Sequence, residues 1–308
     1  MSRETAADRV FLVGFSLTRQ RSSVKFLFRG ENYSSVMMNG NGKPNGNYEV
    51  AAVRKALEML CEFGMDSPSL SVSDLSRRMV MPKSTTHNLL RTLESMDFLK
   101  QDASDKRYRL GPRLYELGMR FSHNTRLVSA ALPHLKRLAA ETKETVKLGV
   151  ISDKEILILS AIESPFQLHT RGDEGLRAPL HCTGIGKAIL ATLPSEEVRM
   201  IVAKRGMPRF TPHTIATVER LEEELGQIRG DGFSMDLEEN ELGVICVAAA
   251  IGVLVDGNAA ALSVSAPASR LPRERVREYG ERVLETARAV ETALGARPRG
   301  FPVAMPSS

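Results

Sequence analysis

Six of the polar side chains within residues 83–91, in the N-terminal third of the chain, carry groups that could recognise another molecule. They are Lys83, Ser84, Thr85, His87, Asn88 and Arg91. Their hydroxyl, amide, imidazole, ammonium and guanidinium groups can bond to base edges and to phosphate oxygens. An idle, solvated helix face would carry mostly Glu and Lys. This composition therefore indicates contact with DNA.

The apolar residues around these side chains predict the helix that must carry them. Leu89, Leu90, Leu93 and Met96 recur at three- and four-residue spacing from about 83 to 95, so one stripe is buried and the polar side chains face outward. A shorter helix, DLSRRMV, precedes it, with Ser73 as the expected N-cap. Pro82 separates the two helices, because the residue before a proline avoids the helical region. Two helices joined in this way form a helix-turn-helix.

Two short strands, 98–101 and 107–110, follow with a polar turn between them. We expect Lys106 and Arg107 of this wing to touch the DNA backbone or minor groove. A small helical core with a merely solvated face is the alternative, since helix-turn-helix geometry also occurs in proteins that never bind DNA. The polar composition of the helix and the basic wing favour DNA binding.

Composition limits the remaining classes of function. The 308 residues, 42% apolar and 26% charged, suffice for two globular domains. Three widely spaced cysteines, Cys61, Cys182 and Cys246, argue against a disulfide framework and favour a reducing cytoplasm. The longest apolar run, 242–255, has 14 residues where a membrane-spanning helix needs about 20, so we expect no membrane partner.

The net positive charge of the chain lies in its first 120 residues. Residues 1–49 hold 7 Lys and Arg against 4 Asp and Glu, and residues 50–120 hold 12 against 9. Residues 121–308 hold 23 against 24. The positive excess therefore lies on the segment that is predicted to meet phosphates.

The pattern divides the chain into five parts. We expect a disordered or spurious extension over 1–48, a winged helix-turn-helix over 49–111, a linker helix over 112–133, an effector-binding domain over 134–295 and a loose tail over 296–308. The helical pattern after the wing is expected to break near Pro133. Hairpins at 146–162 and 244–266, mixed with helices, predict an α+β fold with an antiparallel sheet.

Three segments resemble the IclR family of bacterial transcriptional regulators. They are LSVSDLSRRMVMPKSTTHNLLRTLESMDFL, PLHCTGIGKAILATL, and IRGDGFSMDLEENELGVICVAAAI with ALSVSAP. The resemblance runs from about Val50 to Pro267. It implies a winged helix-turn-helix, a linker helix and a GAF-like effector domain. It also implies operator DNA and a small-molecule effector, often a carboxylate, as partners, with self-association as a homodimer or dimer of dimers.

The resemblance also implies an effector site. By analogy with the family it consists of Gly184, Ile185, Asp236, Cys246, Ser263 and Ser265. Free N–H groups and the positive end of a helix dipole at Gly184 would favour a carboxylate. Two departures stand out: Ile185 is larger than the small residue often found there, and the N-terminal extension is atypical.

An enzyme is the alternative function. A cysteine-dependent enzyme would use Cys246, His181 and Asp236 as nucleophile, base and orienting group, and a zinc site would use Cys182, Cys246 and His181. A thiol inside an apolar strand is inert, and no CxxC or HxxxH spacing is present. We therefore expect no catalytic residue, no metal and no cofactor.

Overall fold

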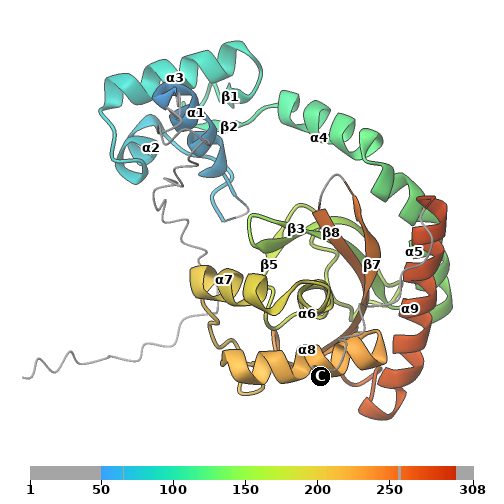
Figure 1. Cartoon of the computed structure of the whole chain (residues 1–308). Coiled ribbons are helices and arrows are strands. Elements are labelled where there is room, and N and C mark those ends of the chain that lie inside the picture. The colour runs from blue at the N-terminus through green and yellow to red at the C-terminus, as the bar shows by residue number, and fades with distance from the viewer. Residues whose placement is uncertain (1–49, 65, 256–257, 296–308) are drawn as a thin grey trace, which may run out of the picture. The chain divides into compact units, whose positions relative to one another are not determined.

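The computed structural model describes residues 50–64, 66–255 and 258–295 (Figure 1). The predictions for 1–48 and 296–308 lie outside these residues. The described part begins with α1 (Ala51–Cys61), α2 (Val72–Arg78), α3 (Lys83–Ser95), β1 (Leu99–Gln101) and β2 (Tyr108–Leu110). The predicted bounds of α3 are confirmed, and both predicted strands of the wing are present, each one residue shorter at its start.

The cap of α2 differs from the prediction, which was wrong by two residues. Ser71 is the N-cap and Ser73 lies in the first turn. The Ser71 side chain accepts a hydrogen bond from the Asp74 backbone N–H at 3.1 Å, and the Asp74 carboxylate accepts one from the Ser71 N–H, also at 3.1 Å. This reciprocal pair requires an acidic or amide side chain three residues after the cap, and Ser71 has one in Asp74 whereas Ser73 does not.

A small core fixes the orientation of α3. Leu90 and Leu93 are buried on its inner side, and Thr86 is buried as well, with its hydroxyl donating to the Pro82 carbonyl. Leu70 pairs with Tyr108 in an antiparallel bridge, which joins the loop before α2 to the wing. The polar side of α3 is therefore held toward solvent.

The helical segment after the wing breaks earlier than predicted. It forms α4 (Pro112–Asn124) and α5 (Arg126–Thr142), with Thr125 in an extended conformation between them. Pro133 lies inside α5, so the expected break at Pro133 was wrong. A proline removes one helical N–H donor. Here that loss is tolerated, and the interruption falls at Thr125, whose hydroxyl donates to the Phe121 carbonyl.

The C-terminal domain is built on an antiparallel sheet. In the described residues it has six strands in the order β5-β4-β3-β8-β7-β6. They are β3 (Thr145–Ser152), β4 (Glu155–Ile162), β5 (Arg177–Ala178), β6 (Ser234–Leu237), β7 (Val244–Val255) and β8 (Asn258–Pro267). The two predicted hairpins are confirmed as the β3–β4 and β7–β8 pairs.

Helices cover both faces of this sheet. Figure 1 shows α6 and α9 on opposite sides of it. The helices of this domain that follow β5 are α6 (Gly184–Ala191), α7 (Ser195–Arg205), α8 (Val218–Asp231), η1 (Arg273–Arg275) and α9 (Val276–Ala293). One core joins α5 and α9 to Val247 and Val264, and a second joins α6 and α8 to Ala248 and Ala261. The α+β class is confirmed.

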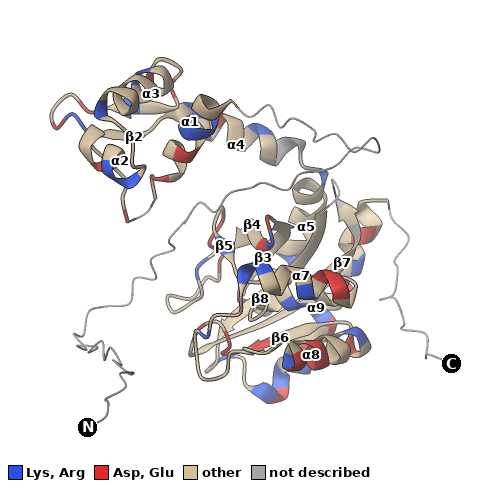
Figure 2. Cartoon of the chain, turned by 60° about the vertical axis from the view of Figure 1, so that its left-hand side comes forward, with Lys and Arg blue, Asp and Glu red and all other residues tan. Residues whose placement is uncertain are grey.

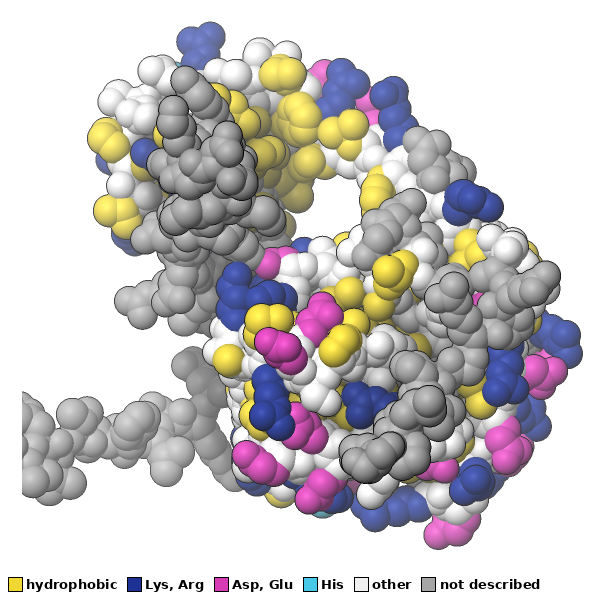
Figure 3. Space-filling model, in the orientation of Figure 1, with side chains coloured by type: hydrophobic (Ala, Val, Ile, Leu, Met, Phe, Trp, Pro, Cys, Tyr) yellow, Lys and Arg dark blue, Asp and Glu magenta, His cyan; other side chains and the backbone are white. Residues whose placement is uncertain are grey.

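The surface of this domain carries charges of both signs. Ion pairs such as Arg199–Glu222 and Arg220–Glu223 lie on α7 and α8, where Figure 2 shows acidic and basic positions interleaved. In the view of Figure 3, Lys and Arg alternate with Asp and Glu over this part of the molecule. In the described residues, no helix has the length and apolar character that a membrane crossing requires.

The packing of α9 predicts the effect of adding a methyl group. A Cβ at Gly280 would lie 2.5 Å from the Phe233 ring, whereas a Cβ at Gly226, on the exposed side of α8, would meet nothing within 4 Å. We expect Gly280→Ala to destabilise the protein by about 1–3 kcal/mol through overpacking. Gly226→Ala should stabilise it by roughly 0.5–1 kcal/mol through helix propensity. Thermal unfolding of both variants tests this packing, and an unchanged midpoint for Gly280→Ala would contradict it.

Candidate functional site

The predicted DNA-contacting side chains lie together on α3. Lys83, Ser84, Thr85, His87, Asn88 and Arg91 are all exposed. Between them, Thr86 and Leu90 are buried, so the exposed and buried positions follow the helical period. The structure brings the six residues to one side of a helix of 13 residues. Their individual roles in binding stay predictions.

The two predicted wing residues have different surroundings. Lys106 is exposed in the turn between β1 and β2. The Arg107 guanidinium donates to the Ser69 carbonyl at 2.9 Å and lies 3.3 Å from the Asp74 carboxylate. Arg107 therefore ties the wing to the start of α2, in addition to any contact it makes with DNA.

The predicted effector residues of the sheet share one face. In register, Asp236 of β6 pairs with Cys246 of β7, and Cys246 pairs with Ser265 of β8. Ser263 lies two residues before Ser265, so its side chain points to the same side. Asp236, Ser263 and Ser265 are each 2% exposed, and Cys246 is half-buried.

The start of α6 lies directly over this face. A Cβ at Gly184 would stand 3.4 Å from the Cβ of Cys246 and 3.3 Å from that of Ala248, so only glycine permits so close an approach without displacement. The Thr183 hydroxyl caps the helix by accepting from the Gly186 N–H at 3.1 Å. Within the described residues, the N–H groups of Gly184 and Ile185 have no acceptor. The Ile185 side chain is buried and packs toward β3 near Gly149.

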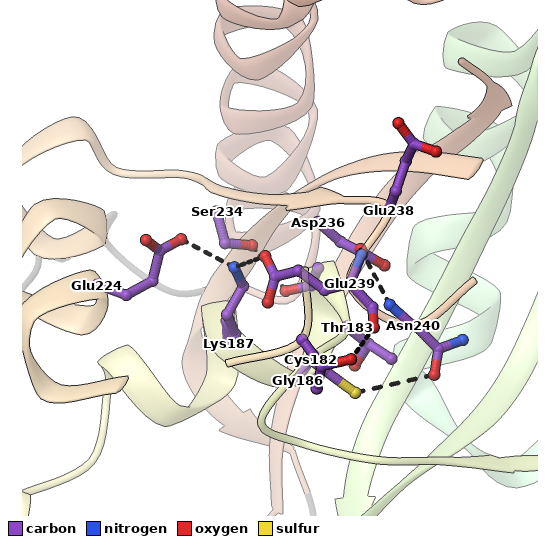
Figure 4. A network of polar contacts seen from close by, with 12 residues as sticks. Cys182, Thr183, Gly186, Lys187, Glu224, Ser234, Asp236, Glu238, Glu239 and Asn240 are labelled. Carbon is purple, nitrogen blue, oxygen red and sulfur yellow. Dashed lines mark hydrogen bonds and ion pairs between the residues drawn. The ribbon is translucent and has the colours of Figure 1, made fainter. Parts of the chain in front are cut away.

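A buried charged network, which the sequence analysis missed, holds α6 in place (Figure 4). Lys187 is fully buried, and its ammonium donates to Glu224 at 2.8 Å and to Glu239 at a shorter distance. Burial would lower the pKa of Lys187, but the charges of Glu239 and Glu224 outweigh it and the pKa is raised. The available signal was a lone lysine inside the apolar segment TGIGKAILAT.

Asp236 connects this network to the predicted effector face. Its Oδ1 accepts from the Glu239 N–H at 2.8 Å and from the Asn240 N–H at 3.4 Å, which closes the turn that carries Glu239 (Figure 4). Burial, reinforced by the charge of Glu239, raises the pKa of Asp236 to about 7. Asp236 is thus a buried carboxyl that can be protonated near neutral pH.

The geometry does not assemble the groups of the alternative enzyme. The His181 imidazole bonds to the Pro208 carbonyl at 3.0 Å and stacks on Phe210. Exclusion of water and the charge of Asp236 raise the pKa of the Cys246 thiol to about 12, which suppresses its nucleophilic form. Among the described residues, no group of three or more His, Cys, Asp or Glu side chains could hold a metal ion.

An N-terminal winged helix-turn-helix joined to an α+β domain with an internal polar face is the architecture typical of a ligand-responsive DNA-binding regulator. A family model described as the bacterial transcriptional regulator IclR C-terminal domain matches residues 119–292, and the model of the IclR helix-turn-helix domain matches residues 52–103. The chain therefore belongs to the IclR family of bacterial transcriptional regulators, as its motifs suggested.

Relatives and solved structures agree with this family. The HTH-type transcriptional repressor AllR of Klebsiella pneumoniae is 35% identical over 260 residues, which cover 84% of this chain and 96% of the relative. An IclR homolog from Microbacterium hydrocarbonoxydans, complexed with 4-hydroxybenzoate, has a TM-score of 0.70 at 29% identity and covers 80% of this chain and 100% of that one. The IclR of Thermotoga maritima has a TM-score of 0.64 at 29% identity, with the same coverage.

The raised pKa of Asp236 makes the stability of the protein depend on pH. The folded state binds this proton more tightly than the unfolded chain, whose Asp pKa is near 3.8, so the stabilisation is complete below that value and is lost as pH rises through about 7. Asn at this position resembles the protonated form and keeps an oxygen acceptor for both N–H groups. Relative to Asp236→Asn, we expect the wild type to lose on the order of 2–3 kcal/mol between pH 5 and pH 8.

Thermal unfolding of the full chain at pH 5, 6, 7 and 8 measures this difference. Asp231→Asn, at the exposed end of α8, is the control and should show no such trend. A difference between wild type and Asp236→Asn that is the same at all four pH values would refute the assignment.

Proposed function

We propose that α3 reads operator DNA and that a small carboxylic acid binds between the start of α6 and the polar face of the sheet, changing the affinity for that DNA. The observation that carries the proposal is the position of Gly184. It brings two N–H groups without acceptors against a face that holds Cys246, Ser263 and Ser265. Backbone N–H groups at a helix start are suited to an anion.

The hydrogen-bond donors of the site and the ligand of a relative both support a carboxylate as the effector. The helix dipole and the serine hydroxyls favour an acid over a neutral ligand of the same shape. The homolog from Microbacterium hydrocarbonoxydans is complexed with 4-hydroxybenzoate, which is itself a carboxylate. We assign binding roles to all six residues that the family resemblance implied. Asp236, Cys246 and Ser265 form one cross-strand row, Ser263 lies in the next row, and Gly184 and Ile185 begin α6.

The protein acts as a homodimer or a dimer of dimers in the cytoplasm. The apolar side chains that α4 leaves exposed support self-association, with Tyr115 at 73%, Phe121 at 59% and Leu117 at 45% exposure. Two copies would present two α3 helices to the two halves of an operator. The raised pKa of the buried thiols and the hydrogen bond that occupies His181 support a role without catalysis.

Regulation follows from differential binding. A ligand changes the DNA affinity only if it binds one arrangement of the two DNA-binding domains more tightly than another. The break at Thr125, between α4 and α5, is the place where such arrangements would differ.

Asn88 and Arg91 are expected to read bases. Asn88→Ala and Arg91→Ala should each cost about 1–3 kcal/mol of specific binding to the DNA upstream of the protein's own gene. Binding to an unrelated duplex should change little for Asn88→Ala, because the free energy of non-specific binding comes from contacts with phosphates. Gel-shift titrations at fixed salt measure both, with Lys136→Ala on α5 as a control outside α3. Specific binding retained by both variants would refute the base-reading roles of Asn88 and Arg91.

A thermal-shift screen tests the effector. We expect at least one acid among lactate, succinate, 4-hydroxybenzoate and similar compounds to raise the unfolding temperature, because a ligand at 100 times its Kd stabilises by about 2.7 kcal/mol. The corresponding neutral amide should not do so at the same concentration. If acids and amides behave alike throughout the panel, the site does not select a carboxylate.

A further inference from the structure

Lys147 of β3 lies on the same face of the sheet as the proposed effector site. In register it pairs with Ser263 of β8, and Ser263 pairs with Ala248 of β7. Gly184 stands over Ala248, and a Cβ at Gly184 would lie 3.3 Å from the Cβ of Ala248. Neighbouring strands lie about 4.8 Å apart, so Lys147 is about 10 Å from Ala248 along this row. A lysine side chain and a small acid can bridge that distance together.

The Lys147 ammonium is paired with a carboxylate that is more exposed to solvent than the lysine itself. It lies 2.9 Å from Asp173, in the loop between β4 and β5. The Lys147 side chain is 15% exposed and that of Asp173 is 35% exposed. Water can therefore solvate Asp173 after separation far better than it can solvate Lys147. The lysine requires an anion at this position, whereas the aspartate does not require the lysine.

Ser263 supplies the second observation. It is 2% exposed and lies on the same face of the sheet as Lys147. A serine hydroxyl can donate to a carboxylate oxygen, so Ser263 adds a neutral donor beside the ammonium of Lys147. Because Ser263 is the direct cross-strand neighbour of Lys147, one bound oxygen pair could accept from both.

The charge of Lys147 is felt within the site. It lowers the pKa of Cys246, against the larger opposite effect of burial. The other charged groups near Cys246 and Asp236 are Glu239 and the buried Lys187, whose ammonium is already bound by two carboxylates. Of these two lysines, Lys147 has the partner that solvent can more readily replace.

We propose that Lys147 is the cation that binds the carboxylate of the effector, and that Asp173 occupies this ammonium until the effector replaces it. The inference rests on the effector function proposed above and adds a residue to it. The incoming carboxylate gains donors that Asp173 does not contact, namely the Ser263 hydroxyl and the N–H groups at the start of α6. Asp173 is released toward solvent, and the exchange leaves the charge of the lysine paired throughout.

Two substitutions with opposite expected effects on acid binding test the exchange. Lys147→Met keeps the length and apolar stem of the side chain without its charge, and should weaken acid binding by about tenfold or more. Asp173→Asn removes the competing anion, and should tighten acid binding by about threefold or more. Asp173 has φ of +58°, a conformation that Asn also tolerates, so the loop is preserved.

The measurement is calorimetric titration of the full chain with lactate, succinate and 4-hydroxybenzoate, each beside its neutral amide. Lys136→Met, on the exposed side of α5, controls for loss of a positive charge and should bind like the wild type. Any binding of the amides should be equal in the wild type and Lys147→Met. Tighter binding by Asp173→Asn together with weaker binding by Lys147→Met supports the exchange.

Ser263→Ala separates this inference from the proposed function. If Ser263→Ala weakens acid binding while Lys147→Met and Asp173→Asn leave it unchanged, the effector site stands and the role of Lys147 is wrong. If the wild type binds none of the three acids, the proposed effector class and the role of Lys147 both fail. Weaker binding by Asp173→Asn would show that Asp173 belongs to the site rather than competing for it, and would overturn the exchange.

Discussion

The alternation of side chains along β7 and β8 is the constraint on which the C-terminal domain depends. Successive residues point to opposite faces, so Val247 and Val264 enter the core under α5 and α9, while Cys246 and Ser263 face α6. A shift of register by one residue would bury the valines under α6 and direct the polar groups into the opposite core. The polar face and the larger apolar core are thus two results of a single strand pairing.

The second requirement is that α6, all of whose residues are buried, keep one fixed position over that face. Lys187 accomplishes this at considerable electrostatic cost, because an ammonium and two carboxylates leave water together. Glu239 Oε2 has no hydrogen-bond partner among the described residues, so the network is not fully satisfied. Such a cluster specifies one arrangement more than it adds stability, and it connects α6, α8 and the turn closed by Asp236.

The sequence predicted those features that local periodicity determines. The bounds of α3, the two hairpins and the outward polar side of α3 all follow from spacing that a single element displays. The ends of helices were predicted less well, because they depend on which side chain bonds to which backbone group. Ser71 and Ser73 are both good caps by residue type, and only the pairing with Asp74 selects Ser71. Pro133 is a strong helix breaker by type, yet the break is at Thr125.

Contacts between distant segments were out of reach of the sequence alone. Lys187 and Glu239 are 52 residues apart, and Lys147 and Asp173 are 26 apart, so neither pair has a local signature. The resemblance to the IclR family supplied Gly184, Asp236 and the two serines, and the structure brings these together on one face. It supplied neither lysine, because no motif had marked those positions as polar contacts.

The small residues under α6 have a consequence for how such a protein can change its specificity. Ala248, Ala250, Ala259 and Ala261 line the face toward α6, where larger side chains would collide with the helix. Adding one or two carbons at such a position would push α6 away from the sheet, while the core on the opposite face of the strands would keep its side chains. The size of these four side chains thus sets the spacing between α6 and the sheet. Single nucleotide changes at these positions would alter that spacing, and with it the size of the acid that fits, without a change of fold.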